Sequence, residues 1–139
     1  MMDYTVRARA QKGQAGLAEC KEATLTMDTT PEGQPGAFNP AELLLASVAA
    51  CMIKNIERVA PMLGFEFRGA EVEVRGFRQE KPPLMEHIEY VLTVDTDEPD
   101  RRLELLHANV KKHGTIFNTL AKATELTGSI RRARSMVRS

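Results

Sequence analysis

Cys51 is the side chain with the clearest capacity for chemistry in this sequence. It follows a long apolar run that begins at Leu43, at a spacing typical of a helix. A cysteine attacks as the thiolate, and it needs a cationic or hydrogen-bonding neighbour that favours this form. Burial alone would favour the inert alternative, in which Cys51 is a small apolar core residue. The surroundings of Cys51 therefore decide between a reactive and a structural thiol.

A charge that could stabilise a Cys51 thiolate must come from outside its own helix. The residues four positions away, Ser47 and Asn55, are uncharged. Arg7 and Arg9 lie on an alternating N-terminal segment and are the most economical cationic candidates. We therefore expect one of these two arginines to reach the thiol.

Three other residues are weaker candidates for the same chemistry. Glu42 could be a catalytic acid, but a glutamate in a first helical turn also stabilises the helix dipole. Cys20 could be a second thiol only if its Cα lies within about 7 Å of that of Cys51, and we expect no disulfide between them. His113 could donate a proton, or simply sit at a helix C-terminus. The histidines have no metal-ligand spacing and no CxxC motif exists, so we expect no metal or other cofactor.

The element that must position Cys51 is a central helix from Phe38 to Ala60. Asn39 and Pro40 suit its cap and first position, and Pro61 and Gly64 are expected to end it. Two adjacent apolar stripes predict burial from two sides. The side chains expected to face water are those of its last turns: Lys54, Asn55, Glu57 and Arg58. One modest sheet cannot cover such a helix, so we expect an intimate homodimer.

The remaining chain predicts strand pairs separated by helices. Strands are expected at 3–10, 17–28, 66–78, 88–95 and 126–132, with a long loop around Lys81–Pro83 between the middle pair. Two more helices are expected, one capped by residues 96–99 and a short one capped by Thr115. The order β-β-α-β-β-α-α-β indicates an α+β fold in a single domain, residues 1–139.

The composition excludes several other classes of protein. Nineteen basic and nineteen acidic residues cancel, and aromatic residues make up 5% of the chain, so we expect no nucleic-acid partner. The arginines near the C-terminus are expected to be solvated: Arg131, Arg132, Arg134 and Arg138. We see no signal segment or apolar run of membrane-spanning length, and expect a cytoplasmic protein with no membrane partner.

The segment NPAELLLASVAAC resembles the cysteine-helix motif of the OsmC/Ohr family of thiol-dependent peroxide-handling proteins. KKHGTIFNTLAKATELTGSI resembles the family's second-cysteine segment and final strand. The resemblance covers nearly the whole chain. It implies an intertwined α+β homodimer with two sites at its interface. It also implies that a reactive cysteine attacks the peroxide, that a second cysteine resolves it, and that a glutamate and an arginine activate the first thiol.

Carried over by position, these roles are only partly present. Cys51 matches the reactive cysteine, but the family's glutamate position is Ala41, one residue before Glu42. The position of the second cysteine is Gly114. The arginine would be Arg7 or Arg9. The chain therefore resembles a divergent, single-cysteine branch of the family.

Two functions follow as hypotheses. The first is an OsmC-like stress-response enzyme, which reduces organic hydroperoxides through Cys51 and relies on an external thiol reductant to complete the cycle. The alternative is a non-catalytic protein that binds a lipid-like or thiol ligand at the dimer interface. Ala41 and Gly114 favour binding, whereas Cys51 favours catalysis.

Overall fold

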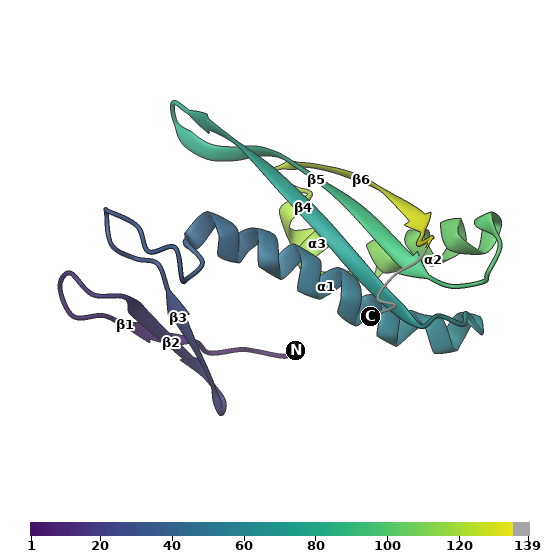
Figure 1. Ribbon diagram of the computed structural model, residues 1–139, viewed down its shortest axis with the longest axis horizontal. Coiled ribbons are helices and arrows are strands. Elements are labelled where there is room, and N and C mark those ends of the chain that lie inside the picture. The colour runs from purple at the N-terminus through teal and green to yellow at the C-terminus, as the bar shows by residue number, and fades with distance from the viewer. Residues whose placement is uncertain (135–139) are drawn as a thin grey trace. The chain divides into compact units, whose positions relative to one another are not determined.

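The computed structural model describes residues 1–134, in which three helices and six strands form a mixed α+β fold (Figure 1). The predicted fold class is confirmed. The elements are β1 Arg7–Arg9, β2 Gly16–Cys20, β3 Ala23–Met27, α1 Pro40–Leu63, β4 Gly69–Glu80, β5 Pro83–Asp95, α2 Asp100–Lys112, α3 Thr115–Leu120 and β6 Glu125–Arg132. They belong to two compact units, Met1–Leu44 and a second that begins at Leu45. The expectation of a single domain stays a prediction.

The first unit contains an antiparallel sheet in the order β1-β2-β3. The prediction of one strand over 17–28 is wrong, because the chain turns at Lys21, whose φ of 57° lies in the left-handed region. Gly16 is the single buried residue of Met1–Leu44. Several large apolar side chains of this unit are exposed, namely those of Tyr4, Val6, Leu25 and Phe38. This small sheet therefore has no apolar core of its own.

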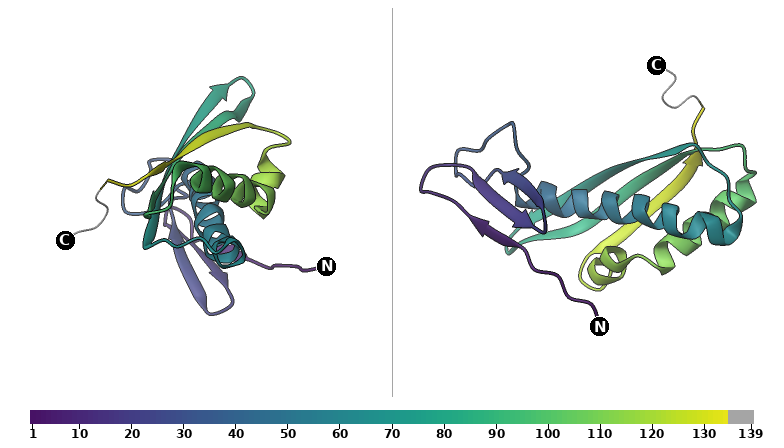
Figure 2. Two further views of the ribbon diagram at one scale, coloured as in Figure 1. Left: turned by 90° about the vertical axis from the view of Figure 1, so that its right-hand side faces the viewer. Right: turned by 90° about the horizontal axis from the view of Figure 1, so that it is seen from below.

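The second unit contains a sheet in the order β4-β5-β6, with β5 antiparallel to β4 and parallel to β6. The expected long loop between β4 and β5 is wrong. β4 extends to Glu80 and β5 starts at Pro83, so two residues connect them. Figure 2 shows that α1 and α2 lie on the same face of this sheet. The opposite face, at the middle of β4 and β5, carries charged residues such as Glu73, Arg75 and Glu89.

Helix α1 begins with a reciprocal capping box. The Glu42 N–H donates to Asn39 Oδ1 at 2.8 Å, and the Asn39 N–H donates to Glu42 Oε1 at 2.9 Å. The prediction that Pro61 ends this helix is wrong, since α1 continues to Leu63. A proline in a last turn removes only one backbone hydrogen bond, so the helix can tolerate it. Gly64, with φ of 62°, follows the end of the helix.

The core of the second unit lies between α1, α2 and the inner face of the sheet. It contains part of the predicted stripes of α1, the stripe of α2, inward-facing residues of β5, and Phe65 from the connection after α1: Val48, Met52, Ile56, Val59, Ala60, Phe65, Tyr90, Leu92, Val94, Leu103, Leu106 and Val110. One expectation for this helix is wrong. Asn55 was expected to face water with its charged neighbours, but it is only 6% exposed. Its position on the helix places it with Met52 and Val59 rather than with Lys54.

A buried tyrosine–histidine pair links β5 to α2. Tyr90 Oη lies 2.6 Å from His107 Nε2, and the two rings meet edge to face. Gly128 makes room for this pair, because a Cβ there would lie 2.4 Å from the Tyr90 ring. Burial raises the pKa of Tyr90 to about 12. Burial also lowers the pKa of His107, assisted by the charge of Lys111 and opposed by that of Glu104.

This pair predicts a stability maximum between two pH limits. As the pH falls below 6.5, the unfolded chain protonates His107 before the folded one does, so the free energy of unfolding decreases. As the pH rises above 10, the unfolded chain loses the Tyr90 proton first, and stability again decreases towards a pH of about 12. Thermal unfolding midpoints measured across this pH range show both decreases in stability. A Tyr90→Phe variant should lose the decrease above pH 10 and keep the decrease below pH 6.5. An unchanged decrease at alkaline pH would contradict the assignment to Tyr90.

No helix within residues 1–134 is long and apolar enough to cross a membrane. 

Candidate functional site

The candidate site is built around Cys51, in the middle of α1. Its side chain is half-buried and free. One turn later, Asn55 Nδ2 lies 2.9 Å from the Cys51 carbonyl oxygen and 3.4 Å from Cys51 Sγ. Asn55, an uncharged residue on the same helix, therefore donates to the sulfur. This contact was not predicted from the sequence. The only sequence signal for this contact is the four-residue spacing of a cysteine and an amide on one helical face.

Gly114 lies directly beside this sulfur. It is buried between α2 and α3, and a Cβ at this position would lie 3.3 Å from Cys51 Sγ. Gly114 is the N-cap residue of α3, so the prediction that Thr115 caps this helix is wrong. Its φ of −83° is open to any L-amino acid. The position that the family resemblance assigns to a second cysteine is thus next to the first, but here it carries no side chain.

Three other candidate residues, Glu42, Arg7 and Arg9, belong to the first unit. Glu42 is part of the capping box at the start of α1 and hydrogen-bonds the Asn39 N–H. Arg9 forms an ion pair with Glu19 across β1 and β2, and Arg7 is exposed on β1. Whether either arginine stabilises a Cys51 thiolate stays a prediction.

Two further candidates were Cys20 and His113. Cys20 is a free thiol at the end of β2, where its register partner is Ala23. His113 is exposed and is the C-cap residue of α2. The absence of a Cys20–Cys51 disulfide after oxidation stays a prediction. In the described part of the chain, no group of three or more metal-ligating side chains comes together.

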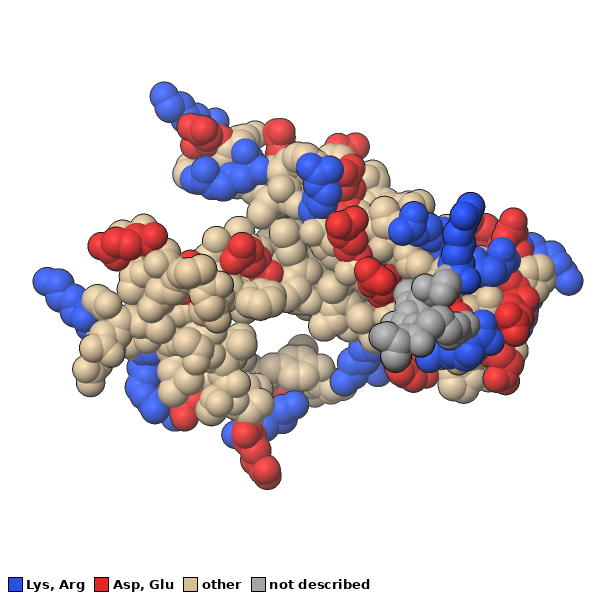
Figure 3. Space-filling view, viewed as in Figure 1, with Lys and Arg blue, Asp and Glu red and all other residues tan. Residues whose placement is uncertain are grey.

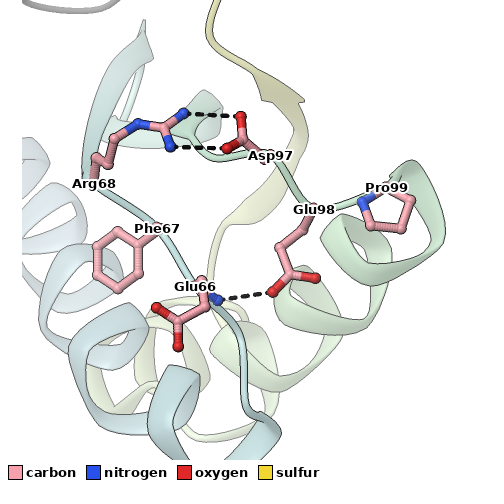
Figure 4. Close-up of a pocket in the computed structure, with 6 residues that line it drawn as sticks. All are labelled: Glu66, Phe67, Arg68, Asp97, Glu98 and Pro99. Atoms are coloured by element: carbon pink, nitrogen blue, oxygen red, sulfur yellow. Dashed lines mark hydrogen bonds and ion pairs between the residues drawn. The ribbon is translucent and has the colours of Figure 1, made fainter.

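A pocket of about 270 Å³, separate from the surroundings of Cys51, lies near the start of β4 and the start of α2. Figure 4 shows the contacts among its lining residues: the two terminal guanidinium nitrogens of Arg68 donate to Asp97, and the backbone N–H of Glu66 donates to Glu98. That N–H bond lowers the pKa of Glu98, and the Arg68 hydrogen bond lowers the pKa of Asp97. Figure 3 shows acidic and basic side chains intermixed at this end of the second unit. We interpret this cluster as structural.

Two of the arginines near the C-terminus make hydrogen bonds to other parts of the second unit. Arg132 donates to the Glu98 carbonyl and pairs with Asp100, and Arg131 donates to Thr93 Oγ1. Arg134 is exposed, and Arg138 lies outside the described residues.

The fold and the site together define a class: a small α+β protein with a free thiol on its central helix. The family model for the OsmC-like protein matches residues 31–128. The chain belongs to the OsmC-like family. No curated protein matches the sequence.

Solved structures show the same fold at low sequence identity. The OsmC-like protein from Mycoplasma pneumoniae has a TM-score of 0.83 at 18% identity, covering 95% of this chain and 96% of that one. The organic hydroperoxide resistance protein OsmC from Legionella pneumophila has a TM-score of 0.70 at 21% identity, with coverage of 94% and 98%. The organic hydroperoxide resistance protein OhrB of Bacillus subtilis has a TM-score of 0.64 at 22% identity, with the same coverage.

Proposed function

We propose that this protein reduces organic hydroperoxides through the thiol of Cys51. The observation that carries the proposal is the half-buried, free Cys51 sulfur, which accepts an amide N–H and faces the empty side-chain position at Gly114. Membership of the OsmC-like family supports it, as do two structural neighbours described as organic hydroperoxide resistance proteins.

The first half of the cycle oxidises the sulfur. The Cys51 thiolate attacks one oxygen of the hydroperoxide, the O–O bond breaks, and the sulfur keeps that oxygen as a sulfenic acid. The other oxygen leaves as an alkoxide and takes a proton to become an alcohol. Two electrons pass from sulfur to the peroxide. Cys51 is therefore the nucleophile and the site of oxidation.

The second half of the cycle needs a reductant from solution, because Gly114 supplies no thiol. An external thiol attacks the sulfenic acid, which releases water and forms a mixed disulfide with Cys51. A second thiol then displaces the Cys51 thiolate and leaves as part of the external disulfide. We propose a cytoplasmic location, where low-molecular-weight thiols are kept reduced.

We also propose that the working form is a homodimer. The sheet of the first unit has no core, and α1 exposes the apolar side chains of Ile53 and Met62. Sedimentation at micromolar concentration should give about twice the chain mass of 15.5 kDa, because burial of these surfaces favours association. A folded, fully active monomer at that concentration would contradict the proposal.

One observation favours the second candidate function, the binding of a lipid-like or thiol ligand without turnover. It is that Gly114, whose Cβ position lies beside the Cys51 sulfur, carries no second thiol. Under this alternative a ligand would bind whether or not Cys51 can be oxidised.

Consumption of cumene hydroperoxide in the presence of a dithiol distinguishes the two functions. We expect many hydroperoxide molecules to be consumed per protein chain, with consumption lost after alkylation of Cys51. Binding of the hydroperoxide without consumption would reject the enzyme and favour the ligand-binding alternative.

A further inference from the structure

We propose that Asn55 is a positioning residue for the Cys51 thiol, and that its second N–H stabilises the thiolate. This inference rests on the proposed role of Cys51 as the reacting thiol. Asn55 does not touch the substrate in this proposal; it acts through the sulfur. The sequence led us to expect that Arg7 or Arg9 stabilises the Cys51 thiolate. In this proposal, Asn55 supplies part of that stabilisation from the same helix as Cys51.

The geometry gives both amide hydrogens of Asn55 a partner. Asn55 Nδ2 lies 2.9 Å from the Cys51 carbonyl oxygen and 3.4 Å from Cys51 Sγ. A primary amide carries two N–H donors, so one can serve each acceptor. The orientation of the amide is fixed by chemistry, because turning it over would place two acceptor oxygens 2.9 Å apart. The sulfur is thereby held between the amide and the position of Gly114.

The Asn55 amide is buried, so it destabilises the fold unless its N–H groups make hydrogen bonds. Asn55 is 6% exposed and lies in the apolar stripe of Met52, Ile56 and Val59. A polar group in such a place costs free energy unless its hydrogen bonds are made, whereas leucine would fill the same space without that cost. The bond to the carbonyl oxygen satisfies one donor. The sulfur is the acceptor that the structure offers to the other.

The bond to sulfur is what separates Asn55 from similar residues in the chain. Asn109 Nδ2 donates to the Leu105 carbonyl at 2.9 Å, and Thr119 Oγ1 donates to the Thr115 carbonyl at 2.8 Å. Both make the same bond to the residue four positions earlier, but neither has a sulfur beside it. A donor binds an anionic acceptor more strongly than a neutral one, so the second N–H of Asn55 favours the thiolate.

Three variants in a Cys20→Ser background test the proposal, with Cys51 as the only thiol. Asn55→Leu removes both donors. Asn55→Thr keeps a hydroxyl for the carbonyl, as Thr119 does, but has no second hydrogen for the sulfur. Asn109→Leu is the matched control, since it removes a carbonyl bond of the same kind on another helix, α2, where no bond to sulfur is made. The readout is the rate of alkylation by iodoacetamide as a function of pH.

We expect both Asn55 variants to alkylate roughly fivefold to tenfold more slowly near neutral pH, with the pH profile moved to higher pH. At high pH their rates should approach that of the parent, because every thiol is then ionised. Asn109→Leu should match the parent throughout. If Asn55→Thr alkylates with the same pH profile as the parent, the proposal is wrong, because the bond to the carbonyl oxygen would then be enough to keep Cys51 reactive. This variant tests the proposal even if Asn55→Leu does not fold. Alkylation needs no hydroperoxide, so a failed turnover assay would reject the proposed function without deciding the role of Asn55.

Discussion

Replacing Cys51 with serine is expected to abolish hydroperoxide reduction, with a loss of at least about 10³-fold in rate. Serine keeps the size and position of the side chain, but its hydroxyl is not ionised near neutral pH and cannot store the transferred oxygen. The measurement is consumption of cumene hydroperoxide with a dithiol as reductant. The fold should survive, because Cys51 is only half-buried.

Cys20→Ser is the control for this experiment. Cys20 lies in the first unit, at the end of β2, and the proposed cycle gives it no role. Its replacement should leave the rate unchanged. If Cys51→Ser retained the parental rate while Cys20→Ser lost it, the reacting thiol would have been assigned to the wrong cysteine.

The Gly114→Cys variant is expected to gain an internal disulfide with Cys51. The Cβ of the new residue would lie 3.3 Å from Cys51 Sγ, close to the distance of about 3 Å that a disulfide requires between these atoms. After hydroperoxide treatment, the introduced thiol should attack the Cys51 sulfenic acid and release water. Mass spectrometry without reductant should show the loss of two hydrogen atoms and a peptide that links the two positions.

This disulfide should also stabilise the protein. It would close a loop from residue 51 to residue 114, which in the chain-entropy treatment contributes about 4 kcal/mol to the free energy of unfolding. Thr115→Cys is the matched control, because its side chain is exposed at the start of α3 and should form no such bond. A sulfenic acid that persists in folded Gly114→Cys would contradict the placement of this position beside the sulfur.

Periodicity predicted the elements that bury one face. The sequence predicted a stripe of Leu45, Ala49, Met52, Ile56 and Val59 in α1 and one of Leu103, Leu106 and Val110 in α2. All of these residues are buried except Leu45 and Ala49, which are half-buried. The alternation in β4 and β5 was equally clear, and it placed Val94 and Leu92 on the inner face. These predictions succeeded because a buried face requires apolar residues at many regularly spaced positions, so the pattern does not depend on any single residue.

Turns and the ends of helices and strands were harder to predict, because each depends on one or two residues. Lys21 adopts a left-handed φ without being glycine, so nothing in the sequence separated β2 from β3. The prolines of Lys81–Pro83 predicted a long loop, but Pro82 lies in a two-residue connection and Pro83 is the first residue of β5. Pro61 predicted the end of α1, yet it lies inside the last turn.

The site could be predicted in part. The motif around the central helix identified Cys51, and the resemblance identified Gly114 as the neighbouring position, which the structure places against the sulfur. Asn55 was missed because a polar residue after an apolar run was expected to face water. Its role depends on the helical angle that puts it above Cys51 and among core residues, which composition does not reveal.

The mass of the protein after treatment with one equivalent of an organic hydroperoxide shows whether Cys51 is the reacting thiol. We expect the gain of one oxygen atom per chain, located at Cys51 by trapping the sulfenic acid, and its removal by a dithiol. Cys20 should remain a free thiol. An unoxidised Cys51, with both thiols of the chain still free after this treatment, would show that Cys51 does not reduce hydroperoxides.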